Sequence, residues 1–284
     1  MVRFVSYANG EKKGLAVEVS GEWRGLNESE VGYPGDLLTL LRSGDLRRAG
    51  ASLEEAPAID LEKVRFLPPV SDPEKIICIG LNFKDHSAES GFTQPEYPTI
   101  FGRFNSSLIA HGDPILRPPV SEQLDYEGEL VAIIGKAGRN VAEADALEYV
   151  AGYSIFNDAS IRDYQFKAPQ WTPGKNFDDT GAFGPWFVTA DELPPGCEGL
   201  RLQTRLNGQV VQEASINDMV FSVAKLIAIL SAFLTLKPGD IIVAGTPSGV
   251  GLARKPPLWM KDGDVCEVEI EGIGILSNPV HDHK

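Results

Sequence analysis

Residues 125–131 read DYEGELV and carry the strongest single indication of fold and site in this chain. They lead into the apolar residues 132–134, so we expect a buried β-strand over residues 127–134. Side chains alternate between the two faces of a strand, which places Glu127 and Glu129 on one face. Two such carboxylates repel each other unless a cation or a proton neutralises them. The alternative is an acidic strand edge that faces solvent.

A third carboxylate follows a second expected strand, which spans residues 149–156. Asp158 stands where this strand ends and a helix is expected to begin, so it either caps that helix or joins Glu127 and Glu129. Together the three carboxylates would form an all-oxygen site. Oxygen ligands are typical of Mg²⁺, Mn²⁺ or Ca²⁺ rather than zinc.

Three further segments carry groups that could transfer a proton or bind a charged substrate. His86 and Glu89 are adjacent on a helical turn, where they form either a surface ion pair or a pair that accepts a proton from water or carbon. Lys175 stands in a Gly/Pro-containing loop and is either a solvated turn lysine or a fixed cation for a substrate carboxylate or carbonyl. The loop at 244–251, AGTPSGVG, presents backbone N–H groups, but it lacks the Gly-Lys-Ser/Thr of a P-loop.

The first part of the chain is expected to form a small unit. Strands at residues 4–7 and 15–19 and an amphipathic helix over 36–48 fit its pattern of apolar residues. The paired prolines in residues 67–70 mark the boundary, because proline suits neither a helix nor a central strand.

The second part is expected to be rich in strands. The apolar patterns predict strands at 75–80, 240–244 and 264–270, in addition to the two already described. They also predict helices over 142–150 and 218–234, the second capped by Ser215 or Asn217 and stopped by Pro238-Gly239.

The bulk composition excludes several classes of function. The chain has 284 residues with 40 acidic and 26 basic side chains, a formal net charge of −14, which argues against nucleic acid or an anionic membrane as partner. The three cysteines form no CxxC pair, so neither a disulfide framework nor a structural zinc site is expected. The first ten residues lack the apolar run of a secretory signal, and the cytoplasm is the expected compartment.

Taken in order, these segments resemble the fumarylacetoacetate hydrolase superfamily from about residue 75 to residue 280. Within it, the chain is similar to bacterial acylpyruvate hydrolases and 2-hydroxyhepta-2,4-diene-1,7-dioate isomerases. The motifs that carry the resemblance are GLNF at 80–83 with His86 and Glu89, residues 101–115, DYEGEL at 125–130, AGY at 151–153, ND at 157–158, RD at 162–163, GKNFD at 174–178 and AGTPSGVG at 244–251. One departure is Phe83, where the family usually has tyrosine, so a hydroxyl is missing there.

The resemblance implies an α+β, β-rich fold. It would be a mixed β-sheet roll, with a small N-terminal α/β domain at 1–69 and a catalytic domain at 70–284. It also implies a homodimer, and Mg²⁺ or Mn²⁺ bound by Glu127, Glu129 and Asp158, with Ca²⁺ as an ion that could occupy the site in a crystal. The roles it implies are catalysis by His86, Glu89 and Lys175 and substrate binding by Arg162, Gln165, Thr246 and Gly245, with Arg162 alternatively pairing with a ligand carboxylate.

The activity implied is cleavage of a C–C bond in a 2,4-dioxo acid, an acylpyruvate, to pyruvate or a related keto acid and a carboxylic acid, as in the catabolism of aromatic compounds. In that hypothesis Glu89 orients His86, which removes a proton from water. Isomerisation or decarboxylation of hydroxymuconate-type diacids, or decarboxylation of oxaloacetate, is the alternative, and a non-catalytic metal-binding protein is a third. Residues 253–260 and Trp171 are candidates for the far end of the substrate. Because this small keto-acid substrate is itself an anion, the charge of −14 opposes its approach, and a divalent cation is expected to offset it.

Overall fold

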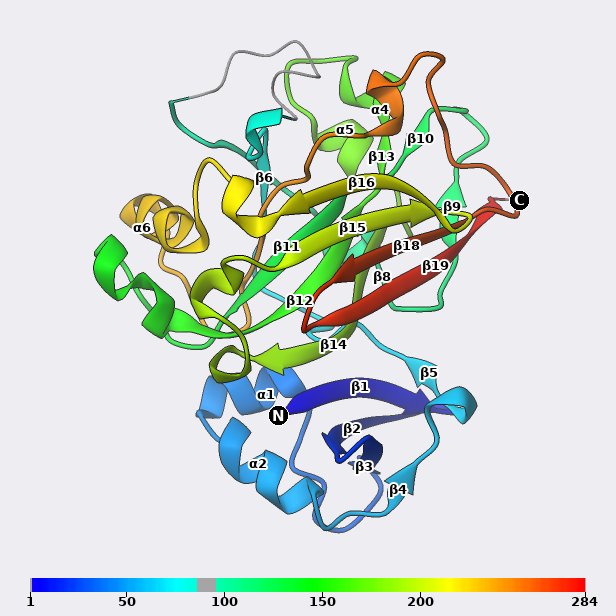
Figure 1. The fold of residues 1–284 in the computed structure, drawn as a ribbon. Helices are drawn as coiled ribbons and strands as arrows, with labels where there is room; N and C mark the ends of the chain where they lie inside the picture. The colour runs from blue at the N-terminus through cyan, green and yellow to red at the C-terminus, as the bar shows by residue number, and fades with distance from the viewer. Residues whose placement is uncertain (1, 86–95, 284) are drawn as a thin grey trace.

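The computed structural model describes residues 2–85 and 96–283 and is built around one large mixed β-sheet (Figure 1). The sheet order is β4-β3-β2-β1-β14-β12-β11-β17-β6-β7, with β5 paired to β1 and β8 paired to β14. The strands are β1 Arg3–Asn9, β2 Lys12–Val19, β3 Glu22–Asn27, β4 Ala58–Ile59, β5 Arg65–Phe66, β6 Ile76–Gly80, β7 Thr99–Gly102, β8 Leu108–Ile109, β11 Gly128–Ile134, β12 Val150–Asp158, β14 Gly181–Thr189 and β17 Ile241–Val243.

A second sheet lies across β11 and β12 (Figure 1). Its order is β16-β15-β18-β19-β9, and a two-stranded ladder of β10 and β13 stands beside it. The bounds are β9 Ile115–Arg117, β10 Leu124–Asp125, β13 Ser160–Ile161, β15 Arg201–Leu206, β16 Gln209–Ser215, β18 Val265–Ile270 and β19 Gly274–Asp282. Most pairings are antiparallel, but β6–β17, β8–β14 and β9–β19 are parallel. The predicted strand-rich α+β fold with mixed sheets is therefore confirmed.

Strand β11 is buried along its whole length because both of its faces are covered. Leu130 and Ala132 pack in the core cluster beneath the second sheet. Val131 and Ile133 point the other way, into a second core cluster that includes residues of helix α1. The alternation expected from the sequence is thus present, and it continues through Glu129 into the site.

In the part of the chain that the structure describes, the α-helices are few and short. They are α1 Leu37–Ser43, α2 Leu46–Leu53, α4 Arg162–Gln165, α5 Thr172–Lys175 and α6 Val223–Phe233. The single helix predicted over 36–48 is wrong, because Gly44 adopts a left-handed conformation with φ 75° and its N–H bonds to the carbonyl of Leu40, which closes α1. Asp36 caps α1 by accepting a hydrogen bond from the backbone N–H of Thr39 at 2.7 Å.

Two other predicted helices differ in detail. Helix α6 begins at Val223 and is capped by Ser222, whereas Ser215 caps the separate 3₁₀ turn Ile216–Asp218. The polypeptide between these elements is extended at Met219, so one amphipathic pattern covers two elements. Residues 142–150 form the 3₁₀ turn Glu143–Tyr149 rather than an α-helix.

The N-terminal strands extend the large sheet. Arg3 pairs with Val188 and Phe4 with Phe187, so β1 adds directly to β14. The core cluster around Phe4 also contains Val131 of β11. The domain boundary between residues 69 and 70 stays a prediction. Within residues 2–85 and 96–283, no helix is long and apolar enough to span a membrane.

Candidate active site

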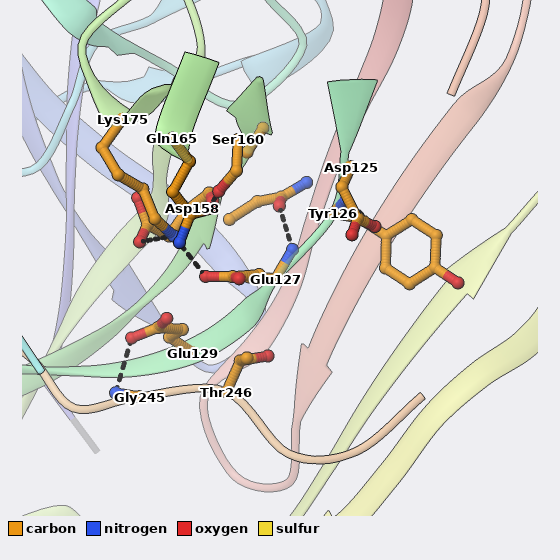
Figure 2. Close-up of polar contacts among 12 residues, drawn as sticks. Asp125, Tyr126, Glu127, Glu129, Asp158, Ser160, Gln165, Lys175, Gly245 and Thr246 are labelled. Carbon is orange, nitrogen blue, oxygen red and sulfur yellow. Dashed lines mark hydrogen bonds and ion pairs between the residues drawn. The ribbon is translucent and has the colours of Figure 1, made fainter. Parts of the chain in front are cut away.

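Three carboxylates meet where β11 and β12 lie side by side (Figure 2). The antiparallel register pairs Gly128 with Asn157, which brings Glu127 and Glu129 next to Asp158 at the end of β12. One carboxylate oxygen from each lies within 4.8 Å of the others. Their exposed fractions are only 5%, 2% and 0%. The acidic pair is therefore not a solvent-facing strand edge.

The residue between the two glutamates has to be glycine. A Cβ at Gly128 would lie 2.2 Å from Thr204 Oγ1 and 2.9 Å from a methyl group of Val268, both on the second sheet. Its backbone N–H donates to Gln212 Oε1 at 3.0 Å. This close approach lets β11 fit beneath the second sheet while both glutamates face the other way.

Lys175 lies among these carboxylates. Its Nζ donates to Glu127 Oε2 at 2.6 Å and to Asp158 Oδ2 at 2.7 Å (Figure 2). The side chain is 1% exposed, so Lys175 is not a solvated turn lysine. Burial alone lowers the pKa of Lys175, but Asp158 and Glu127 outweigh it and the pKa is raised. The group is therefore held as an ammonium ion.

Arg103 is a second buried cation at the centre. Its Nη1 bonds to Asp158, while its Nη2 donates to Thr180 Oγ1 at 2.7 Å and its Nε to Ser107 Oγ at 3.2 Å. The sequence alone does not predict this residue, because a single arginine after a short strand carries no local signal of what it will pair with. The same holds for Gln212, whose Nε2 donates to Thr246 Oγ1 at 2.8 Å.

Arg162 is the third cation. Its Nη2 lies 2.6 Å from Glu127 Oε1 and its Nε donates to Asp125 Oδ2 at 2.8 Å. Asp125 also accepts hydrogen bonds from the backbone N–H groups of Gly251 at 2.7 Å and Leu252 at 2.9 Å. Arg162 therefore pairs with a candidate ligand carboxylate, and Asp125 ties it to the loop beyond residue 250.

The charges at this centre do not balance. Four buried carboxylates face three buried cations: Asp125, Glu127, Glu129 and Asp158 against Arg103, Arg162 and Lys175. Within the described chain Glu129 forms no ion pair, and its Oε2 accepts a hydrogen bond from the Gly245 N–H at 2.5 Å. Burial, followed by repulsion from Asp158 and Glu127, raises the pKa of Glu129 well above its ordinary value.

These residues fit a divalent cation. The donor set is entirely oxygen and is held within one small buried volume, and the centre as a whole, with Asp125 included, carries one negative charge in excess of its cations. Hard cations such as Mg²⁺ and Mn²⁺ prefer such oxygen ligands. Glu127, Glu129 and Asp158 are therefore the residues that would hold the ion.

A cavity of about 360 Å³ opens beside this centre. Its wall includes Phe101 and Trp171, whose ring centroids are 5.6 Å apart in an edge-to-face contact. The full lining is Ile79, Gly80, Leu81, Phe101, Glu127, Glu129, Arg162, Gln165, Phe166, Trp171, Lys175, Thr246, Val250, Leu252, Ala253, Arg254 and Lys255. The cavity is large enough for a small organic acid and joins charged and apolar walls.

The remaining predicted substrate-binding residues differ in the hydrogen bonds that they already make within the protein. Gln165 lines the cavity, and its Oε1 accepts a hydrogen bond from Arg162 Nη1 at 2.9 Å. Thr246 also lines the cavity, but its hydroxyl donates to the carbonyl of Gly128 at 3.0 Å. The Gly245 N–H donates to Glu129 Oε2 at 2.5 Å. Contact of Thr246 and Gly245 with a substrate stays a prediction, which requires these hydrogen bonds to rearrange.

Three residues for which the sequence analysis states expectations, Phe83, His86 and Glu89, follow strand β6 along the chain. Phe83 is buried in the main core cluster, where a hydroxyl group would need a polar partner. His86 and Glu89 lie outside the described residues, so their pairing and their place relative to the cavity stay predictions.

The fold and the site together define a class of protein: two packed β-sheets with a buried centre of carboxylate oxygens beside a cavity. The family model described as fumarylacetoacetate (FAA) hydrolase C-terminal matches residues 75–281, and the chain belongs to this family. This confirms the predicted family resemblance. The family includes enzymes named as hydrolases, isomerases and tautomerases.

Several relatives are similar over nearly their whole length. A mitochondrial oxaloacetate tautomerase of Rattus norvegicus is 40% identical over 273 residues, covering 94% of this chain and 86% of that protein. A fumarylacetoacetate hydrolase structure from Exiguobacterium antarcticum is 36% identical, with a TM-score of 0.87 and full coverage of both chains. A maleylpyruvate hydrolase from Sphingobium sp. SYK-6, solved with manganese(II) and pyruvate, is 28% identical, with a TM-score of 0.81 over 99% of this chain and 100% of that one.

Proposed function

We propose that this protein is a divalent-metal-dependent enzyme that interconverts the enol and keto forms of oxaloacetate or a closely related 2-oxo dicarboxylate. The observation that carries the proposal is the single cavity that combines a buried oxygen-ligand centre with the ammonium group of Lys175 and the Arg162–Gln165 pair. The similarity to a tautomerase over 94% of the chain supports this reaction over others in the family.

Tautomerisation requires only the transfer of protons. A proton leaves the enol oxygen at C2 and a proton is added to C3, while no bond between heavy atoms breaks. Mg²⁺ or Mn²⁺, when bound by Glu127, Glu129 and Asp158, would supply Lewis-acid withdrawal of charge from the 2-oxo group. Lys175 donates a hydrogen bond toward the oxygen on which negative charge develops, and burial strengthens this interaction.

Gln165 and Arg162 orient the substrate in this proposal. Arg162 Nη1 holds Gln165 Oε1 at 2.9 Å, which leaves the amide NH₂ group of Gln165 to donate to a ligand in the cavity. Arg162 is in turn held by Asp125 and Glu127, so it orients Gln165 rather than serving as a mobile anchor. Such preorganised donors favour a transition state because they need no rearrangement during the reaction.

The experiment compares three reactions of one protein. Enol-oxaloacetate is mixed with the Mg²⁺-loaded protein, and ketonisation is followed by loss of the enol ultraviolet absorbance. Pyruvate release from oxaloacetate and from an acylpyruvate panel is measured in parallel. We expect ketonisation well above the rate with Mg²⁺ alone, and Glu129→Gln at that background. A kcat/KM for acylpyruvate cleavage or decarboxylation above that for ketonisation would overturn the proposal.

Acylpyruvate hydrolysis is the second candidate, and one specific observation favours it. The similar structure from Sphingobium sp. SYK-6 is named a maleylpyruvate hydrolase and holds pyruvate, the product such a reaction would release. In that case His86, oriented by Glu89, would remove a proton from water. His86→Ala should then abolish hydrolysis but keep metal binding, and unchanged turnover in this variant would contradict the role.

Assembly and compartment are also part of the proposal. A homodimer is expected from the family resemblance, and size-exclusion chromatography with light scattering tests it. The three cysteines, Cys78, Cys197 and Cys266, are free and buried, which suits a reducing compartment. We keep the cytoplasm as that compartment, although several tautomerase relatives are named mitochondrial.

A further inference from the structure

The cations that line the cavity fall into two groups. Arg162 and Lys175 each lie within 2.8 Å of buried carboxylates, which offset their charge. Arg254 and Lys255 line the same cavity, but neither forms an ion pair with any carboxylate in residues 2–85 and 96–283. Among the described residues, the uncompensated positive charge of this cavity is therefore concentrated at residues 254–255.

Arg254 is held in place without being neutralised. Its Nε donates to Tyr126 Oη at 3.1 Å and to the carbonyl of Gly249 at 3.2 Å, and its Nη2 donates to the carbonyl of Val211 at 2.7 Å. All three acceptors are uncharged, and Arg254 is half-buried, so solvent screens its charge only partly. Lys255 follows directly and is exposed, with a long side chain that can follow a ligand at the cavity wall.

The charge balance at the inner end shows why this second group matters. With a divalent cation bound, the four carboxylates and three cations would change from one net negative to one net positive charge. That charge matches a single substrate carboxylate. A second carboxylate on the same substrate would stay unmatched at the inner end and needs a further cation.

We infer that Lys255, backed by the fixed charge of Arg254, binds the distal carboxylate of the substrate and makes the site selective for 2-oxo dicarboxylates over 2-oxo monocarboxylates. The inference rests on the proposed function for the 2-oxo acid end of the ligand. The neighbouring lining residues Val250, Leu252 and Ala253 are apolar and suit the hydrocarbon part of such an acid.

The first test uses a matched pair of substrates in one assay. Oxaloacetate and 2-oxobutyrate differ at C4, where a methyl group replaces the distal carboxylate. Deuterium incorporation at C3 in D₂O, followed by NMR, reports enolisation of both. We expect Lys255→Gln to lower kcat/KM for oxaloacetate about fivefold, the upper range for an exposed ion pair, with less than about twofold change for 2-oxobutyrate.

Two further variants separate a specific contact from a general charge effect. Lys255→Arg keeps the charge and should keep the preference for oxaloacetate. Lys261→Gln removes an exposed lysine of the same chain segment that does not line the cavity, so it changes the net charge equally. If Lys261→Gln lowers kcat/KM for oxaloacetate as much as Lys255→Gln does, the inference is wrong.

A binding measurement tests the proposed carboxylate subsite without requiring turnover. Calorimetry compares malate with 2-hydroxybutyrate, which again differ by the distal carboxylate, on Mg²⁺-loaded protein. We expect the wild type to bind malate more tightly and Lys255→Gln to lose most of that difference. If neither oxo acid is enolised, the proposed function fails, yet a malate preference that Lys255→Gln removes still supports the subsite. Equal wild-type affinity for the two ligands overturns it.

Discussion

Glu129 carries the negative charge that the cations around it leave unbalanced. Its neighbours Glu127 and Asp158 each contact Lys175, whereas Glu129 is held by the Gly245 N–H. An ionised carboxylate that no cation contacts directly is costly inside a protein. A divalent cation beside Glu129 would neutralise this charge. We therefore expect Glu129 to lower the stability of the metal-free protein and to raise its affinity for the ion.

Glu129→Gln therefore has two opposite effects. The amide keeps the shape and the hydrogen bond from Gly245, but it removes the unbalanced charge. We expect the metal-free protein to gain about 1 kcal/mol of unfolding free energy, because no charge remains to be buried without a partner. Mn²⁺ affinity should fall at least tenfold. Urea unfolding and calorimetry measure the two quantities, and a variant that is less stable and binds Mn²⁺ normally would contradict the assignment.

Lys175→Met tests the other side of the same centre. Methionine keeps most of the length and apolar bulk but removes the ammonium group that contacts Glu127 and Asp158. Turnover should fall about 100-fold or more, as for loss of one preorganised donor. Mn²⁺ should bind as tightly as before or more tightly, since a neighbouring positive charge is gone. Loss of metal binding would instead indicate that Lys175 positions the carboxylates that hold the ion.

At the level of single residues, local pattern predicts the ligands better than it predicts their partners. Glu127 and Glu129 follow from alternation along one strand, and Asp158 from the end of another. Arg103 comes from the loop after β7, and its contact with Asp158 depends on how distant strands assemble. Gln212 likewise reaches Thr246 from a different sheet.

At the level of elements, strand β11 decides where the site forms. Its odd-numbered side chains face α1 and the carboxylate centre, while its even-numbered side chains face the second sheet. At Gly128 the two sheets approach closely, since Thr204 leaves no room for a Cβ. The site and the sheet packing therefore depend on the same residue.

Gly128→Ala should destabilise the fold and disturb the metal site together. The added methyl group would force β11 away from Thr204 and Val268, at a cost of about 1–3 kcal/mol for an overpacked core. Gly102→Ala is the matched control, because its Cβ would meet only Ile76 O at an ordinary 3.6 Å. Thermal unfolding of both variants, and of Gly128→Ala with Thr204→Ala, should show a loss that the second substitution partly restores. Equal effects in the two alanine variants would contradict this packing account.

Sequence patterns were less reliable for helices than for strands. The apolar spacing of residues 36–48 suits one helix, but Gly44 closes it and a second helix follows. The pattern at 218–234 spans a 3₁₀ turn and helix α6, because an extended connection keeps the same side buried. Strands β6, β11, β12 and β18 were predicted to within about two residues, since buried strands carry nearly continuous or alternating apolar runs.

At the level of the whole molecule, the net charge of −14 opposes an anionic substrate. At the carboxylate centre itself the sign reverses only if a divalent cation is bound, because its four carboxylates outnumber its three cations; Arg254 and Lys255 add positive charge at the other end of the cavity. A net charge of this size opposes self-association, whereas we expect the charges inside the cavity to determine what binds.

Chelator-treated protein should therefore bind malate poorly, in addition to losing turnover. We expect at least a tenfold weaker malate affinity by calorimetry after metal removal, and recovery when Mg²⁺ is restored. Equal malate affinity with and without metal would contradict the electrostatic argument.

We propose that one buried carboxylate centre holds a divalent ion that is used to move a proton on a 2-oxo dicarboxylate. The most direct measurement is the ketonisation rate of enol-oxaloacetate as Mn²⁺ is titrated into chelator-treated protein. We expect a rate that rises from the background and saturates at one Mn²⁺ per chain. A rate that is already maximal without metal, or that stays at the background with the centre filled, would contradict it.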